Sequence, residues 1–395
     1  MPVRKQRITV LGSTGSIGVN TLDVIARHPD RFEVFALSAS TQVELMLAQC
    51  AQFRPVFAVM ASDAHARLLA ERLKAEGLPS KVLLAPDALQ TISSHEQVDA
   101  VMAAIVGAAG LAPCMAAARA GKRLLLANKE ALVVGGEVFM QAVRAGGGAL
   151  LPIDSEHSAI FQSLPEDPTT WGDRVEKIIL TASGGPFRTR EPSTLRDVTP
   201  DQACAHPNWV MGRKISVDSA TMMNKALEVI EAKYLFGLTP AQIEVVIHPQ
   251  SVIHSMVQYR DTSVVAQLGS PDMRVPIAYG LAWPHRISSG AKPLDFRAMA
   301  NMTFEVPDDA RFPGLPLAWQ VLNGPAGSTA VLNAANEVAV AAFLDGRIRF
   351  DHIHHVNHAT LEAVQVSEVS DIESLLGLDA RSRHVAGQIA LTLES

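Results

Sequence analysis

The sequence predicts an α/β protein in three parts: an N-terminal doubly wound parallel sheet, a central α+β region and a C-terminal helical region. Three observations predict this fold class. Strand-length apolar runs alternate with helix-length amphipathic segments over residues 7–127, mixed strand and helix patterns follow to residue 268, and helical patterns alone follow residue 317. Such alternation is typical of a parallel sheet covered by helices. At 395 residues the chain is also too long for one ordinary core.

Composition excludes several classes of protein. Hydrophobic residues make up 48% and charged residues 19%, which indicates a soluble, folded protein. The net charge of −6 argues against a nucleic-acid partner and leaves room for a local basic site that binds a phosphorylated metabolite. Cys50, Cys114 and Cys204 lie too far apart for a disulfide framework or a zinc motif, which agrees with a cytoplasmic location. We expect neither a signal peptide nor a membrane partner, because the apolar runs are short or interrupted by glycines.

The first element is a strand over residues 7–11, followed by the turn GSTGSIG at 12–18 and a helix over 20–28. This context fits a dinucleotide-binding site of the Rossmann type, in which glycines admit the pyrophosphate and the helix points its amides at it. The spacing is G-x-x-G-x-x-G rather than the stricter G-x-G-x-x-G. A purely structural strand–turn–helix is therefore the alternative.

The second strand, over residues 32–37, predicts which cofactor binds. An NAD site usually has an acid at the end of this strand, to bind the ribose hydroxyls. Here the strand is followed by Ser38, Ala39, Ser40, Thr41 and Gln42. Hydroxyl and amide groups tolerate a 2′-phosphate that a carboxylate would repel, so NADP is favoured, although no Arg or Lys stands there.

The alternation continues as helices over 43–53, 64–76 and 111–120 and strands over 56–60, 82–84, 98–106 and 123–127. Ligands of such sheets bind at the carboxyl ends of the strands. Asn128, Lys129 and Glu130 follow the last of these strands, either as site residues or as a solvated loop. The small residues at 107–110 serve either packing or the approach of a cofactor.

Two carboxylates, Asp154 and Glu156, end the apolar run at 150–153. If that strand continued, both side chains would project to the same side, because side chains alternate along a strand. A hard divalent cation such as Mg²⁺ or Mn²⁺ takes oxygen ligands of this kind. The alternative is an acidic turn. A short helix is expected over residues 158–164.

Polar segments follow in the central region. A strand over 178–181 leads into Ser183, Gly184 and Gly185, which form either an anion nest or an ordinary tight turn. The segment HPNWVMGRK at 206–214 is either a lid over a ligand or an irregular surface loop.

The segment ISVDSATMMNKALE at 215–228 is the most informative part of the central region. Asp218 or Ser219 is expected to cap a helix that runs to residue 236. On this helix Asn224, Lys225 and Glu228 share a face, which suits a phosphate and a third carboxylate ligand for a metal. Glu231 lies on the same face and is an equal candidate by spacing. A surface salt bridge is the alternative for Lys225 and Glu228.

Residues 244–257 and 263–268 read as sheet, and an exposed edge there would favour pairing with another subunit. His248 and His254 are six positions apart and would share a face of one strand, where a histidine is more often a core residue than a catalyst.

Residues 285–316 read as a linker, followed by helices over 318–322, 330–344, 354–364 and 383–393. The histidines at 352, 354, 355 and 358 have no Cys or acid at ligand spacing, so a helical domain is favoured over a metal site.

Seven segments together resemble one enzyme family. They are GSTGSIG at 12–18, ANKE at 127–130, DSEH at 154–157, SGGP at 183–186, HPNW at 206–209, SATMMNKALE at 219–228 and HPQSVIH at 248–254. In this order they resemble 1-deoxy-D-xylulose 5-phosphate reductoisomerase. The resemblance implies conversion of 1-deoxy-D-xylulose 5-phosphate to 2-C-methyl-D-erythritol 4-phosphate with NADPH and Mg²⁺ or Mn²⁺, in the non-mevalonate (MEP) isoprenoid pathway, by a homodimer.

The resemblance also implies a role for each matching residue. Asp154, Glu156 and Glu228, rather than Glu231, would hold the metal and with Lys129 form the catalytic group. The substrate-binding residues would be Lys129, Ser155, Glu156, Ser183, His206, Trp209, Ser219, Asn224, Lys225, Glu228 and His254. The cofactor-binding residues would be Thr14, Gly15, Ser16, Ile17, Ser40, Gln42, Asn128, Glu130 and Gly212. Many members carry a basic residue or Asn at the end of the second strand, where this chain has Ser40, Thr41 and Gln42.

The expected domains are a Rossmann-type domain (1–153), a catalytic and dimerisation domain (154–284), a linker (285–316) and a helical domain (317–395).

Two other functions fit part of the sequence pattern. A metal-dependent sugar-phosphate aldolase or isomerase would consume no NADPH, and the turn at 12–18 counts against it. A dinucleotide-sensing protein would not need three carboxylates. The rearrangement chemistry, a 1,2-shift or cleavage and re-addition, is not determined by the sequence.

Overall fold

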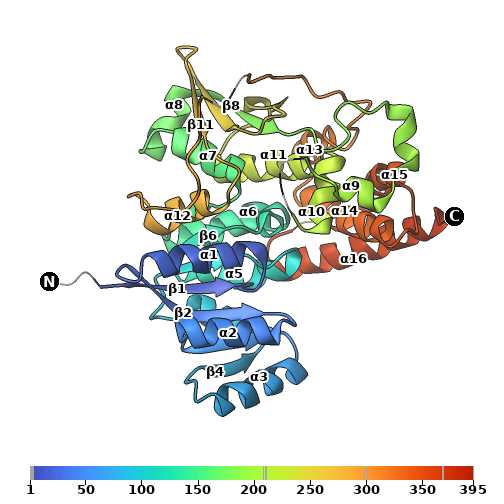
Figure 1. The fold of residues 1–395 in the computed structure, drawn as a ribbon. Helices are drawn as coiled ribbons and strands as arrows, with labels where there is room; N and C mark the ends of the chain where they lie inside the picture. Colours follow the sequence, from blue (N-terminus) through green and yellow to red (C-terminus); the bar gives the residue numbers. More distant parts are fainter. Residues whose placement is uncertain are drawn as a thin grey trace. The chain divides into compact units, whose positions relative to one another are not determined.

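The computed structural model describes residues 4–207, 209, 211–297, 299, 301–366 and 369–394. The chain forms two compact units, and each unit draws on three segments. Unit 1 comprises Met1–Ala131, Phe139–Ser158 and Asp272–Lys292, and unit 2 comprises Leu132–Val138, Ala159–Pro271 and Pro293–Ser395. Many of the elements of both units are labelled in Figure 1.

Unit 1 is built on a seven-stranded parallel sheet, as the sequence predicted. The strands are β1 (Gln6–Leu11), β2 (Phe32–Ala39), β3 (Phe57–Met60), β4 (Lys81–Leu84), β5 (Ala100–Ala103), β6 (Arg123–Leu126) and β7 (Leu150–Pro152). Their order is β4-β3-β2-β1-β5-β6-β7, and every pair is parallel. The strand order reverses between β1 and β5. Sheets of this kind bind ligands at that point, beyond the carboxyl ends of the strands.

The helices of unit 1 are α1 (Ser16–Arg27), α2 (Val43–Phe53), α3 (Asp63–Ala75), α4 (Asp87–Ser94), α5 (Leu111–Arg119) and α12 (Arg274–Ala282), and α6 (Lys129–Gly146) and α7 (Ser155–Ser163) contribute residues to both units. The sequence predicted α1, α2, α3 and α5. It missed α12 because six of its nine residues are buried. A helix buried on most sides shows no amphipathic period.

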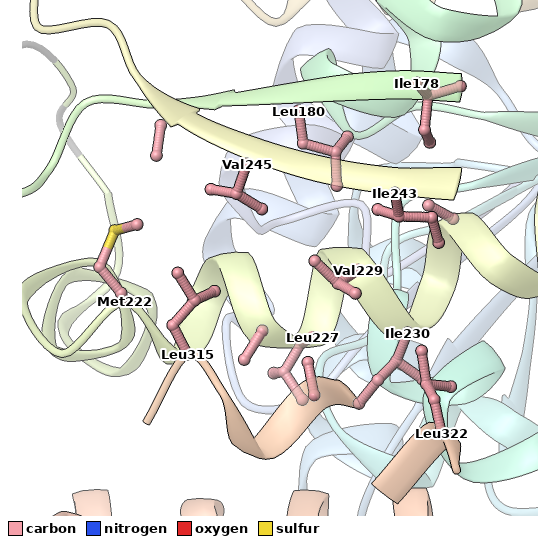
Figure 2. Packing of buried hydrophobic residues seen from close by; sticks show 14 of the residues in the cluster. Ile178, Leu180, Met222, Leu227, Val229, Ile230, Ile243, Val245, Leu315 and Leu322 are labelled. Carbon is pink, nitrogen blue, oxygen red and sulfur yellow. The ribbon is translucent and has the colours of Figure 1, made fainter. Parts of the chain in front are cut away.

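Unit 2 contains a four-stranded mixed sheet in the order β11 (Val264–Leu268), β10 (Ile253–Tyr259), β8 (Val175–Ala182) and β9 (Ile243–Ile247). Strand β10 is antiparallel to β11 and β8, whereas β8 and β9 are parallel. Helix α11 (Met223–Phe236) points Val229 toward Leu180 and Val245 of this sheet, whereas Leu227 lies on the other side of the helix, toward Leu315 (Figure 2). The buried core of unit 2 therefore fixes the helix that carries Asn224, Lys225 and Glu228.

The C-terminal region is helical, as predicted, with α13 (Leu317–Leu322), α14 (Ser328–Leu344), α15 (Phe350–Ala363) and α16 (Ile372–Thr392). The segment 285–316 is irregular where it is described, apart from a bridge between Glu305 and Ile247. It is more than a spacer, because Phe312 and Leu315 lie in the core of unit 2. Among the described residues, no helix is both long and apolar enough to cross a membrane.

Two local predictions were wrong. The helix expected from Asp218 or Ser219 to residue 236 is two helices, α10 (Arg213–Ala220) and α11, divided at Met222, whose φ is +60°. Asp218 does not cap α11, because it lies inside α10 and pairs with Lys214.

The two histidines expected on one strand are also separated. His248 follows the end of β9, and a turn closed by a hydrogen bond from Ser251 N–H to the His248 carbonyl precedes β10, which carries His254. Pro249 follows His248 and has no N–H to offer a ladder, so the strand ends there.

Candidate active site

The turn after β1 requires glycine at two positions. Gly12 has φ +75°, and a Cβ on it would lie 2.7 Å from the Ala104 carbonyl oxygen. A Cβ on Gly18 would lie 2.4 Å from the Gly12 carbonyl oxygen. Both contacts are closer than a side chain tolerates, so these glycines let the backbone fold tightly before α1 begins at Ser16. The first turn of α1 contains no acidic residue that would compete with an anion.

The predicted pyrophosphate residues Thr14, Gly15, Ser16 and Ile17 form this turn and the start of α1. Gly15 and Ser16 are exposed, whereas Ser13 beside them is buried. The Gly15 N–H donates to the Gly12 carbonyl oxygen at 3.1 Å, so the amides left for an anion here are those of the first turn of α1, which have no earlier carbonyl to bond.

Two residues that sequence reasoning missed hold the turn in place. The Ser38 hydroxyl accepts a hydrogen bond from Gly12 N–H at 2.9 Å. The Gln49 amide donates to the Ser13 carbonyl oxygen at 2.9 Å and accepts from the Ser13 hydroxyl at 2.7 Å. Gln49 is 36 positions from Ser13, and no local sequence signal links the two. At the end of β2, Ser40 and Gln42 are exposed.

Asn128 has a supporting role in unit 1. Its carbonyl caps α6 by accepting from Ala131 N–H at 2.8 Å. Its amide donates to the Gly107 carbonyl at 2.9 Å and also to the Ile105 carbonyl. This buried side chain thus ties the loop after β5 to the start of α6. Lys129, the first residue of α6, is held by this cap, so the ANKE segment is not a solvated loop.

Lys129 and Asp154 form a buried ion pair with 2.5 Å between Nζ and Oδ2. Burial disfavours the ionised Asp154 carboxyl, but the charges of Lys129 and His157 and the hydrogen bond from Lys129 outweigh burial. Together they hold the pKa of this carboxyl well below its usual range. Asp154 therefore stays a carboxylate at neutral pH, as a metal ligand must be.

The carboxylates of Asp154 and Glu156 lie close together, as predicted, with oxygen atoms within 4.8 Å of one another, but the strand that was expected to bring them together was wrong. Strand β7 ends at Pro152, and α7 begins at Ser155. Asp154 therefore lies at the start of a helix, where its carbonyl accepts from Ser158 N–H at 2.8 Å. Glu156 lies in the first helical turn, and its carboxylate accepts from the Ser155 hydroxyl at 2.6 Å. The strand alternation rule does not apply beyond the last strand residue.

In unit 2, the turn after β8 packs directly against the end of α10. Gly184 and Gly185 have φ +80° and +63°, and a Cβ on Gly185 would lie 2.6 Å from the Ser219 carbonyl oxygen. The Ser183 hydroxyl accepts from Gly185 N–H at 3.1 Å. Both glycines of this turn have a left-handed backbone, and the turn lies beside the predicted phosphate residue Ser219.

His206 and Trp209 lie close to the same turn. His206 Nε2 is 2.9 Å from the Ser183 hydroxyl, and Trp209 N–H donates to His206 Nδ1 at 3.0 Å. Because Nδ1 accepts this bond, the neutral ring carries its proton on Nε2 and donates to Ser183. The ring of Trp209 lies 6.4 Å from that of His254 on β10. The structure thus brings four predicted substrate residues together within unit 2.

The predicted phosphate residues on α11 form a buried group. Asn224 donates to one carboxylate oxygen of Glu228 at 2.6 Å, and Lys225 pairs with the other. The side chains of Lys225 and Glu228 are only 3% and 1% exposed, so the alternative of a surface salt bridge was wrong. Glu231 is also fully buried on this helix, and Gly212 is exposed at the start of α10.

The remaining histidines have other roles. His248 is buried, is hydrogen-bonded to the Thr303 carbonyl at 2.9 Å and stacks on Phe304, as expected of a core residue. His354 and His358 lie with ring centroids 6.0 Å apart on α15. Within the described part of the chain, no group of three possible metal ligands includes them.

Three family models match the chain. They describe 1-deoxy-D-xylulose 5-phosphate reductoisomerase (residues 8–136), the C-terminal domain of that enzyme (150–236) and a second DXP reductoisomerase C-terminal domain (268–385). The chain belongs to the 1-deoxy-D-xylulose 5-phosphate reductoisomerase family. The resemblance identified in the sequence is confirmed, and so is the predicted fold class.

Relatives of the same family agree over nearly the full length. The 1-deoxy-D-xylulose 5-phosphate reductoisomerase of Aromatoleum aromaticum is 61% identical over 98% of this chain and 96% of the relative. The enzyme of Cupriavidus metallidurans is 59% identical over 96% of this chain and 97% of the relative. A crystal structure of DOX-P reductoisomerase with NADPH, fosmidomycin and magnesium has a TM-score of 0.94 at 43% identity, covering 98% of this chain and 99% of that one. The structure of the Zymomonas mobilis enzyme with NADPH has a TM-score of 0.93 at 45% identity. The match covers 99% of this chain and 100% of that one.

Proposed function

We propose that this chain catalyses the NADPH- and divalent-metal-dependent conversion of 1-deoxy-D-xylulose 5-phosphate to 2-C-methyl-D-erythritol 4-phosphate, in the MEP pathway to isoprenoid precursors. One observation in the fold carries the proposal. The glycine turn after β1, Lys129 after β6 and Asp154 after β7 all follow the carboxyl ends of strands in one parallel sheet. A dinucleotide turn and a buried carboxylate–ammonium pair therefore share one edge, where a reduction assisted by a metal requires them.

The residues of unit 1 fit NADPH. Thr14, Gly15, Ser16 and Ile17 would bind the pyrophosphate with backbone amides at the start of α1. Ser40 and Gln42 would face the 2′-phosphate, Glu130 would lie near the nicotinamide, and Asn128 and Gly212 would contribute further to cofactor binding. When bound, NADPH supplies the hydride that reduces the rearranged carbonyl compound.

The donor set of Asp154, Glu156 and Glu228 fits Mg²⁺ or Mn²⁺, because hard cations prefer carboxylate oxygens. The low pKa of Asp154 supports the assignment, since the carboxylate needs no deprotonation before it binds a cation. When bound, the cation acts as a Lewis acid toward the carbonyl and hydroxyl oxygens of the substrate. Lys129 and Ser155 would contact the same oxygens and orient them.

The phosphate of the substrate would bind in unit 2. Ser183, Ser219, Asn224 and Lys225 would bind it, with His206, Trp209 and His254 around the substrate. Here Lys225 supplies a buried positive charge, and the turn at Ser183 supplies amides in a left-handed backbone. Because the phosphate is remote from the reacting carbons, its binding energy is available to position the substrate and close the segment that carries His206 and Trp209.

We also propose that the protein is a cytoplasmic homodimer. Strand β11 forms one edge of the mixed sheet, and its Val264 and Val265 are 48% and 44% exposed. Phe304 and Val306, in the irregular segment before α13, are exposed too. An apolar sheet edge exposed in this way favours pairing with a second copy. Sedimentation of the purified chain at micromolar concentration tests this expectation.

The decisive experiment follows NADPH absorbance with 1-deoxy-D-xylulose 5-phosphate and Mg²⁺. We expect oxidation that depends on the substrate, stops with EDTA, returns with added Mg²⁺ or Mn²⁺, and is absent in Asp154→Asn. A folded wild-type protein that converts the sugar phosphate without consuming NADPH would instead support a redox-free isomerase or aldolase. Binding of NADPH without any turnover, unaffected by EDTA, would favour a sensing protein.

A further inference from the structure

Asp218 is a buried carboxylate to which the proposed chemistry assigns no role. Its side chain is only 1% exposed and lies in α10. One carboxylate oxygen pairs with Lys214 Nζ at 2.8 Å, one turn earlier on the same helix. The other oxygen accepts a hydrogen bond from the Asn336 amide of α14 at 2.8 Å. Both oxygens therefore have partners, which a buried charge requires.

The contact continues into a third helix. The Asn336 carbonyl oxygen accepts from the Asn357 amide of α15 at 3.2 Å. Asn336 and Asn357 are both fully buried. Asp218, Asn336 and Asn357 thus form a buried polar chain, and it links α10 to two helices of the C-terminal region. Directional bonds of this kind fix the position of a helix more narrowly than apolar packing does.

Helix α10 connects two parts of the proposed phosphate site. It begins after Gly212, which follows the segment with His206 and Trp209, and it carries Ser219 one residue after Asp218. The chain then passes through Met222, in a left-handed conformation, into α11. A rotation or shift of α10 would therefore move Ser219 directly.

The position of Ser219 has little freedom. Gly185 leaves no room for even a Cβ against the Ser219 carbonyl oxygen, so the Ser183 turn and α10 fit together closely. Helix α10 itself has only eight residues, of which four are buried. So short a helix is not stable by itself, so its position depends on its contacts with neighbouring segments.

We propose that Asp218 is a positioning residue for phosphate binding: with Asn336 it holds α10 so that Ser219 meets the substrate phosphate. The inference rests on the proposed function, because it takes Ser219 as a phosphate ligand. If Asp218 acts in this way, the C-terminal helices that hold it contribute to the affinity for the substrate.

Three variants test the proposal. Asn336→Asp replaces the donor amide with a carboxyl group 2.8 Å from that of Asp218, and two buried carboxyl groups so close cannot both be ionised. The pair must take up a proton at the assay pH, and we expect this cost to displace α10 and to raise KM for the sugar phosphate about tenfold, the effect of one lost charged hydrogen bond. Asp218→Asn is expected to raise KM less, because an amide still accepts from Asn336. The reciprocal double variant, Asp218→Asn with Asn336→Asp, restores one carboxylate and one amide, and we expect KM within about threefold of wild type. In all three, kcat and KM for NADPH should change by less than about threefold.

Asp379→Asn is the matched control. Asp379 is also a buried carboxylate paired with a cation one turn away, Arg383 at 2.6 Å, but it lies on α16, and Arg383 links it to Glu337 rather than to α10. We expect this variant to lower the melting temperature without raising KM for the sugar phosphate. An equal rise of KM in Asp379→Asn, or no rise in Asn336→Asp, would overturn the proposal, and so would a double variant no better than Asn336→Asp.

A second measurement separates this proposal from the proposed function. Inorganic phosphate, titrated calorimetrically into each variant, reports the phosphate site without turnover. Weaker phosphate binding in Asn336→Asp, restored in the double variant, supports the positioning role even if wild type does not turn over the sugar phosphate. Unchanged phosphate binding in all variants would overturn the positioning role even if wild type is fully active.

Discussion

Gly185 lies against Ser219 so closely that a Cβ at position 185 would come within 2.6 Å of the Ser219 carbonyl oxygen. Two segments 34 positions apart in sequence thereby form one surface. The contact explains why position 185 is a glycine, and it makes this position a sensitive probe of the proposed phosphate site.

Gly185→Ala is expected to separate the Ser183 turn from α10. The added methyl group strains the backbone by about 1–2 kcal/mol and also forces Ser219 away. We therefore expect KM for the sugar phosphate to rise about tenfold or more, while KM for NADPH changes little, because the cofactor turn lies in unit 1. Steady-state kinetics with each substrate varied in turn measures both.

Gly237→Ala is the control for this prediction. Gly237 has almost the same φ, +64°, but a Cβ on it would meet no atom of the described residues within 4 Å. This variant carries the backbone strain without the clash, so it should lower stability by about 1 kcal/mol and leave KM unchanged. An equal effect of both variants on KM would mean that strain alone, and not the contact with Ser219, is responsible.

Lys129→Met should destabilise the protein most at neutral pH. In wild type the depressed pKa of Asp154 contributes stability above the unfolded pKa, which is lost as pH falls through the folded value. Without Lys129, burial dominates and raises the pKa of this carboxyl. The buried carboxylate then costs about 3 kcal/mol at pH 7, and the loss shrinks as acid protonates it.

Urea unfolding of wild type and Lys129→Met at pH 7 and pH 5 measures this difference. The surface pair of Lys177 and Glu244, with side chains 31% and 46% exposed, provides the control. Lys177→Met should change stability by less than about 1 kcal/mol at both pH values. A destabilisation by Lys129→Met that is the same at pH 7 and pH 5 would contradict the assigned role of the Asp154 charge.

Much of the fold followed from the sequence because its signals are local. The strands of unit 1 are continuous apolar runs, and the glycine turn between β1 and α1 has a recognisable spacing. Asn128, Lys129 and Glu130 were placed at the carboxyl end of a strand for the same reason. Helix α12 was missed because burial on most sides removes the amphipathic period.

The structural details that depend on partners distant in the chain did not follow from the sequence. The division between α10 and α11 rests on Met222, a residue whose type does not indicate a left-handed conformation, and on burial of its side chain in the core of unit 2 (Figure 2). Asp218 reads locally as a cap, yet its partner Asn336 is 118 positions away. Gln49, which supports the glycine turn, likewise has no local signal. The family resemblance named the proposed site residues but not the residues that hold them in place.

Asn128→Asp should weaken cofactor use more than substrate binding. The wild-type amide donates to the carbonyls of Ile105 and Gly107, and a carboxylate would face these two oxygens without a proton to share. We expect the loop after β5 to leave α6 and KM for NADPH to rise about tenfold. Ser62→Ala, which removes the cap of α3, is the control and should lower stability by about 1 kcal/mol without changing KM for NADPH.

Ser40→Asp should reverse the preference for NADPH. Ser40 is exposed just after β2, where an acid would accept the ribose hydroxyls of NADH and repel the 2′-phosphate of NADPH. We expect kcat/KM to fall at least about tenfold for NADPH and to rise for NADH. Ser40→Asn keeps the size without the charge and should retain the preference for NADPH. If both variants lower kcat/KM for NADPH equally, the side chain at position 40 acts through its shape, and the preference must come from other residues near the 2′-phosphate.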